Sequence, residues 1–100
     1  MLSMKLTKNG NDAVVEMDGR IDANNAGEAK QKLLEVAGRF DNLTLDLAEL
    51  KYISSAGLRT LKSLYTAMKT KGGKLLLRSV RPDVMEVFKA TGFWGLFDFA

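Results

Sequence analysis

Apolar residues alternate with polar ones in several short stretches of the chain, a pattern typical of strands with one face in water. Residues 4–7 and 13–22 show it on both sides of NGND, an Asn-Gly turn signal that favours a β-hairpin. Gly19, within the second arm, indicates a bulge. Further along, NLTLDLAEL alternates again and predicts an interior strand, and KLLLRSV predicts a short buried strand.

Three other stretches carry apolar residues every three or four positions, which predicts amphipathic helices. DANNAGEAKQKLLEVAG predicts the first helix, which ends at Gly38. Its candidate N-terminal caps are Asp22, Asn24 and Asn25. The second helix is expected from Ser55 to about Thr70, and the third starts at RPD with Pro82 in its first turn. The tail GFWGLFDFA predicts a tight turn and a last short element.

The order hairpin, helix, strand, helix, strand, helix predicts an α/β fold with crossover helices on a partly parallel sheet. The chain has 100 residues, of which 46% are hydrophobic. That length and composition fit a single domain over residues 1–100 with a core of its own.

Composition narrows the chemistry. The chain contains no cysteine and no histidine, which removes disulfides, thiolate chemistry, the commonest general base and the commonest metal ligand. The N-terminus has no apolar signal region, and no apolar run approaches membrane-spanning length. We therefore expect a soluble cytoplasmic protein without a metal or a cofactor.

Charge is distributed unevenly along the chain. Residues 1–50 hold 6 Lys and Arg against 9 Asp and Glu, whereas residues 51–100 hold 9 against 3. A basic half can bind nucleic acid, but these cations are scattered and are not interleaved with aromatic residues. Solvated helix faces explain the distribution better, and nucleic-acid binding remains an alternative.

The stretch KYISSAGLRTL joins a predicted strand to a predicted helix, the place where α/β proteins commonly carry functional residues. Ser54 fits an N-terminal cap of that helix. Gly57 needs a separate reason, because a glycine in a helix costs about 1 kcal/mol relative to alanine. Two interpretations are open: the small residues admit a phosphate or another backbone to the helix N-terminus, or they allow close packing on the sheet.

Enzymatic use of Ser55 is disfavoured by its surroundings. A serine nucleophile needs a base, and without histidine only a lysine or a carboxylate such as Asp22 or Asp46 remains. The motifs GxSxG, GxxxxGK[ST] and GxGxxG are all absent. We infer that the protein is not an enzyme and that the serine is a substrate.

Four blocks of sequence, GRIDANNA, LTLDLAELKYISSAGLRTL, GGKLLLRSV and VFKATGFWGLFDF, occur here in one order and spacing. In this the chain resembles a STAS domain of the bacterial anti-sigma factor antagonist family, over nearly its whole length. The resemblance implies a mixed sheet of four to five strands with an N-terminal hairpin and three to four helices packed mainly on one face. The tail aromatics, Phe93, Trp94, Phe97 and Phe99, are then expected in the core.

The same resemblance implies a phosphorylation site at Ser55, two positions before the glycine of the turn. Relatives often have aspartate where this chain has Ser54, and a second serine where it has Ala56. The family's contact surface around this turn corresponds here to Asp22, Ala23, Asn24, Ser54, Ser55, Gly57, Leu58 and Arg59. Asp22 has a second interpretation, as a cap of the first helix.

The implied function is a partner switch. The unphosphorylated protein binds a histidine-kinase-like anti-sigma factor with ATP-dependent serine/threonine kinase activity, and phosphorylation of Ser55 releases it, with a phosphatase to reset the cycle. Direct nucleic-acid or membrane partners are not expected. The alternative is a STAS scaffold that does not switch, or a module that binds a nucleotide or a lipid.

Overall fold

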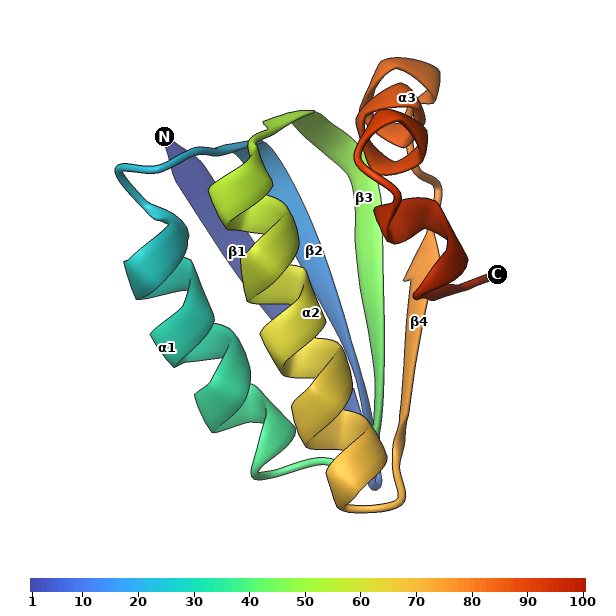
Figure 1. The fold of residues 1–100 in the computed structure, drawn as a ribbon. Coiled ribbons are helices and arrows are strands. Elements are labelled where there is room, and N and C mark those ends of the chain that lie inside the picture. Colours follow the sequence, from blue (N-terminus) through green and yellow to red (C-terminus); the bar gives the residue numbers. More distant parts are fainter.

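The chain folds into a five-stranded sheet with its helices on one side (Figure 1). A computed structural model describes all residues, 1–100. In chain order the elements are β1 (Leu2–Asn9), β2 (Asp12–Ile21), α1 (Ala26–Ala37), β3 (Asn42–Ile53), α2 (Ser55–Thr70), β4 (Lys74–Arg78), α3 (Pro82–Ala90), the 3-10 turn η1 (Phe93–Gly95) and β5 (Asp98–Phe99). None of the helices has the length and apolar character needed to cross a membrane.

The strands lie in the sheet in their chain order, from β1 to β5. β1 and β2 form the predicted antiparallel hairpin, whose turn contains Gly10 with a φ of 62°. The other neighbouring strands are parallel and are joined through α1, α2 and α3, which confirms the partly parallel α/β fold. Since β2 and β3 run in the same direction, their carboxyl ends meet at one edge of the sheet.

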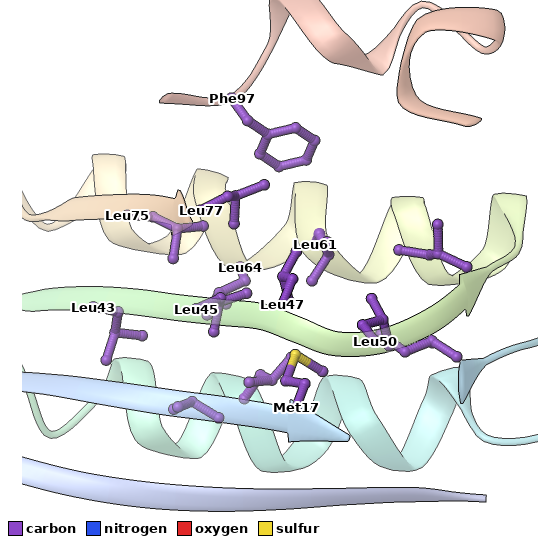
Figure 2. Packing of buried hydrophobic residues seen from close by; sticks show 14 of the residues in the cluster. Met17, Leu43, Leu45, Leu47, Leu50, Leu61, Leu64, Leu75, Leu77 and Phe97 are labelled. Carbon is purple, nitrogen blue, oxygen red and sulfur yellow. The ribbon is translucent and has the colours of Figure 1, made fainter. Parts of the chain in front are cut away.

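A single cluster of buried side chains joins the sheet to all three helices. Figure 2 shows leucines of β3 and β4 beside Leu61 and Leu64 of α2. The alternation read from NLTLDLAEL places Leu43, Leu45 and Leu47 in this core, each no more than 1% exposed. α1 and α2 lie side by side over the sheet (Figure 1), so the opposite face carries the polar half of each strand.

Two register shifts separate β2 from a regular pairing with β3. One lies between Glu16 and Asp18 and the other between Gly19 and Arg20. The second shift adjoins Gly19, but the unpaired residue there is Lys51 of β3, so the bulge predicted at Gly19 lies on the neighbouring strand. Gly19 has a φ of 117°, and a side chain there would collide with the carbonyl oxygen of Met1. After the second shift Arg20 lies directly opposite Tyr52.

The second helix extends from Ser55 to Thr70, as the sequence predicts. The prediction of a buried aromatic tail holds for Phe97 but is wrong for Trp94, which is 51% exposed. Trp94 lies in η1 and stacks on Phe99, with ring centroids 5.7 Å apart, so it covers the core edge from outside.

Candidate functional site

The two strand-to-helix junctions, from β2 to α1 and from β3 to α2, meet at the carboxyl edge of the sheet (Figure 1). The backbone amide of Ser54 donates a hydrogen bond of 2.9 Å to the carbonyl of Ile21. One backbone contact therefore connects the two sequence regions expected to form the site, although these residues are 33 positions apart in the chain.

At the β3–α2 junction, Ser54 and Ser55 have different tasks. Ser54 is the N-terminal cap of α2, and its hydroxyl accepts a hydrogen bond of 3.2 Å from the amide of Gly57. Ser55 is the first helical residue; it is exposed, and its hydroxyl makes no hydrogen bond within the chain. Of the two serines, Ser55 is the one open to a reaction from solvent.

Close packing requires a residue without a side chain at position 57. An added Cβ would lie 2.8 Å from methyl or methylene carbons of both Ile21 and Ile53, which are buried at the ends of β2 and β3. The absent side chain faces the core, so of the two interpretations left open by the sequence the structure supports close packing of the helix start on the sheet.

The β2–α1 junction is a loop whose side chains bond mainly to its own backbone. The carboxylate of Asp22 accepts a hydrogen bond of 2.9 Å from the amide of Asn24 and pairs with Arg20 Nε at 3.3 Å. The Asn25 side chain accepts from the amide of Asp22 and donates to the carbonyl of Arg20, each at 2.9 Å. Asn25 occupies the cap position of α1 but makes no cap bond, so α1 begins without a side-chain cap and Asp22 closes the loop instead.

Electrostatics at this loop favour a charged Asp22. The bond from the Asn24 amide is the main cause that holds the pKa of the Asp22 carboxyl below its ordinary value of 3.8. Desolvation opposes the shift, and the Asn25 amide and Arg20 reinforce it. Asp22 therefore remains a fixed negative charge beside the second junction.

A buried hydrogen bond holds the starts of the two helices together. Thr60, one turn into α2 and 4% exposed, donates its hydroxyl proton to the carbonyl of Ala26 at 3.1 Å. Ala26 is the first residue of α1, so Thr60 fixes where the loop of Asp22 and Asn24 lies relative to Ser55. The sequence showed only a polar residue within a helical pattern.

The residues predicted to contact a partner divide by exposure. Ala23, Asn24, Ser55 and Arg59 are exposed, and Asp22 and Ser54 are half-buried. Gly57 and Leu58 are buried, and Leu58 has no exposed surface. In this conformation Leu58 and Gly57 offer a partner no side-chain contact: Leu58 belongs to the core, and Gly57 allows the close approach of α2.

Arg20 and Tyr52 adjoin this site, and sequence reasoning missed both. Their strands pair at these positions, and the Arg20 guanidinium lies 4.6 Å from the centre of the Tyr52 ring. Tyr52 is 42% exposed. The available signal was the change of spacing in β3, where buried residues two apart give way to Leu47, Leu50 and Ile53, three apart.

This arrangement presents a hydroxyl for modification and lacks catalytic machinery around it. Ser55 has no hydrogen bond to a base that could activate it. No three Asp, Glu, His or Cys side chains form a group that could hold a metal ion. Ser55 is therefore an accessible hydroxyl without a neighbouring base.

Comparison with known proteins gives a consistent result. The family model of the STAS domain matches residues 3–100. A putative anti-sigma factor antagonist of Bordetella bronchiseptica, BtrV, is 38% identical over 80 residues, which cover 76% of this chain and 69% of that protein. The anti-sigma-B factor antagonist of Bacillus subtilis is 27% identical over 97 residues, which cover 97% of this chain and 89% of that protein.

Solved structures share the fold. The anti-sigma factor antagonist SpoIIAA in its unphosphorylated form superposes with a TM-score of 0.81 at 16% identity, over 98% of this chain and 88% of that one. The phosphorylated form of SpoIIAA from Bacillus gives 0.74 at 16% identity, over 98% and 91%. From its sequence blocks, its fold and these matches together, the chain belongs to the STAS domain family.

Proposed function

We propose that this protein is an anti-sigma factor antagonist that works as a partner switch. Unphosphorylated, it binds an anti-sigma factor in the cytoplasm and so releases a sigma factor for transcription. Phosphorylation of Ser55 ends the complex. The observation that carries this proposal is the first turn of α2, where Ser55 is exposed and makes no hydrogen bond while its neighbour Ser54 is occupied as the cap.

The relatives support the binding half of the proposal. Two curated relatives carry the name anti-sigma factor antagonist, in the 38% identical protein as a putative one. SpoIIAA, which shares the fold, exists in a phosphorylated form. We infer that the partner here is a histidine-kinase-like anti-sigma factor that transfers phosphate from ATP to Ser55, and that a phosphatase removes it.

The exposed residues of the two junctions form the proposed contact surface. Ala23 and Asn24 contribute from the β2–α1 loop, and Ser55 and Arg59 contribute from α2. The backbone bond from Ser54 to Ile21 and the Thr60 bond to Ala26 hold these two halves in one arrangement. A rigid surface loses little entropy on binding.

A phosphate on Ser55 changes this surface without disturbing the fold. It adds a charge of about −1.5 to −2 at pH 7, and within a closed interface that charge must lose its water. In the free protein it stays in solvent at the N-terminus of α2, where anions are favoured. Arg59 lies one turn along the helix and can pair with it. The switch is therefore local and does not require unfolding.

Intact mass spectrometry tests the proposal. The wild type, Ser55→Ala and Ser54→Ala are incubated with ATP and each purified anti-sigma factor of the kinase class from the source organism. We expect one kinase to add a single phosphate to the wild type and to Ser54→Ala, and none to Ser55→Ala. Circular dichroism confirms that the variants are folded.

The binding half is tested separately, by calorimetric titration of the same kinase with unphosphorylated and phosphorylated protein. The proposal requires that binding weakens by at least tenfold after phosphorylation. Binding without phosphate transfer would indicate a scaffold that does not switch. Binding of ATP or of lipid vesicles, with no affinity for any anti-sigma factor, would replace the proposal with a ligand-binding module.

A further inference from the structure

Tyr52 is an exposed aromatic side chain at the edge of the proposed contact surface. It is 42% exposed, and it lies on β3, one residue before the core residue Ile53 and three before Ser55. Its ring projects from the sheet face opposite the helices, because Ile53 beside it points into the core. The surface around Ser55 thus continues onto the open face of the sheet.

A chain of contacts links this ring to the β2–α1 loop. The guanidinium of Arg20 lies 4.6 Å from the ring centre, and its Nε donates to Asp22 at 3.3 Å. Asp22 in turn accepts from the amide of Asn24. The register shift between β2 and β3, which leaves Lys51 unpaired, brings Arg20 opposite Tyr52. The Tyr52 ring is therefore connected to the β2–α1 loop through the Arg20 side chain.

Arg20 and Tyr52 both carry polar groups that make no hydrogen bond within the protein. The terminal nitrogens of Arg20 donate no hydrogen bond within the protein, and the side chain of Arg20 is 53% exposed. The Tyr52 hydroxyl also has no partner. The planar guanidinium group of arginine can donate two parallel hydrogen bonds to a carboxylate. Tyrosine and arginine are also among the residues that contribute most to binding energy in protein interfaces.

We propose that Arg20 and Tyr52 form an anchor for the anti-sigma factor, which receives an apolar side chain against the Tyr52 ring and a carboxylate at the Arg20 guanidinium. This rests on the proposed function and extends its contact surface from the helix starts to the open sheet face. The anchor adjoins Asp22 through Arg20, so one partner segment can contact the loop and the ring together.

The chain offers a matched control at Trp94. This ring is also exposed, by 51%, and also has a cation near it, since Lys89 Nζ lies 5.5 Å from its centre. It lies in η1, which follows α3 and is separate from both junctions in the chain. A general loss of exposed aromatic surface would affect both positions alike, whereas an anchor would affect Tyr52 alone.

The experiment is a calorimetric titration of the kinase that phosphorylates the wild type, with Tyr52→Ala, Trp94→Ala and Arg20→Lys in parallel. We expect Tyr52→Ala to weaken binding by at least tenfold and Trp94→Ala by less than twofold. Arg20→Lys keeps the charge but loses the planar fork, and a three- to tenfold loss is expected. Unchanged melting temperatures show that the fold is intact.

Photo-crosslinking separates direct contact from an effect transmitted through Asp22. Benzoylphenylalanine placed at position 52 is expected to crosslink to the kinase in the unphosphorylated complex, and the same group at position 94 is not. Wild-type binding together with less than a twofold effect of Tyr52→Ala, or no crosslink at 52, overturns the anchor and leaves the proposed function standing. Absence of wild-type binding to any anti-sigma factor overturns both.

Discussion

The two strand-to-helix junctions lie at the same edge of the sheet, but their polar side chains bond to different segments. Those of the first junction bond to the preceding loop and strand, and that of the second bonds to the following helix. At the β2–α1 junction, four residues separate the elements, and Asn25 bonds back to Arg20 and Asp22, so α1 starts without a side-chain cap. At the β3–α2 junction only Ser54 intervenes, and it bonds forward to Gly57. The longer junction fixes its own loop, and the shorter one leaves the next residue, Ser55, free.

The largest expected effect comes from the glycine of each first turn. Gly57→Ala places a Cβ 2.8 Å from carbons of Ile21 and Ile53, which should destabilise the protein by about 1–3 kcal/mol, the range for overpacked cores. Gly27→Ala in α1 meets no atom within 4 Å and should stabilise by up to about 1 kcal/mol. Urea denaturation measures both. Equal effects of the two substitutions would show that packing does not distinguish the junctions.

The two serines give the next effect. Ser54→Ala removes the cap bond to Gly57 and should cost about 1 kcal/mol of unfolding free energy. Ser54→Asp keeps a capping oxygen, so its unfolding free energy should lie within about 0.5 kcal/mol of that of the wild type. Ser55→Ala, at an exposed position, should also change stability by less than about 0.5 kcal/mol. A large loss of unfolding free energy in Ser55→Ala would show that the Ser55 hydroxyl makes a stabilising contact in the folded protein.

The sequence predicted the local features of these junctions better than the loop contacts. Period-two and helical patterns predicted the hairpin, the α/β order and the bounds of α2, because such patterns report burial directly. The cap of α2 was also predicted, since Ser54 acts on its own next turn. The side-chain cap expected for α1 is absent, because the side chains of Asp22 and Asn25 bond within the preceding loop instead.

The candidate site follows the same division. Ser55 was proposed from a local motif, whereas the burial of Leu58 could be seen only once the helix had packed on the sheet. Arg20 and Tyr52 come together through a register shift, and Thr60 meets α1 across 34 positions of sequence. Contacts between distant segments leave little trace in a single sequence.

A negative charge at Ser55 should give a smaller effect, and in the stabilising direction. α1 has an acidic residue, Glu28, in its first turn, whereas α2 has none. Ser55→Glu should therefore be more stable than the uncharged control Ser55→Gln by about 0.3–1 kcal/mol at low salt. Thermal unfolding at low and high salt provides the measurement, and the difference should shrink at about 1 M salt. A destabilising charge would argue against a local switch.

The smallest effect concerns the charge that closes the longer junction. The Asn24 amide bond lowers the pKa of Asp22 below 3.8, so the folded state favours the carboxylate. This contribution to stability is present above the pKa of the unfolded state and is lost as the pH falls through the lower pKa of the folded state.

The substitution Asp22→Asn keeps an acceptor oxygen but has no charge. The wild type should therefore be the more stable of the two at neutral pH, by a margin kept small by solvent, and that margin should vanish in acid. Urea denaturation of both proteins at a series of pH values tests this, and a margin that persists below the folded pKa would assign the loop's stability to its hydrogen bonds and not to its charge.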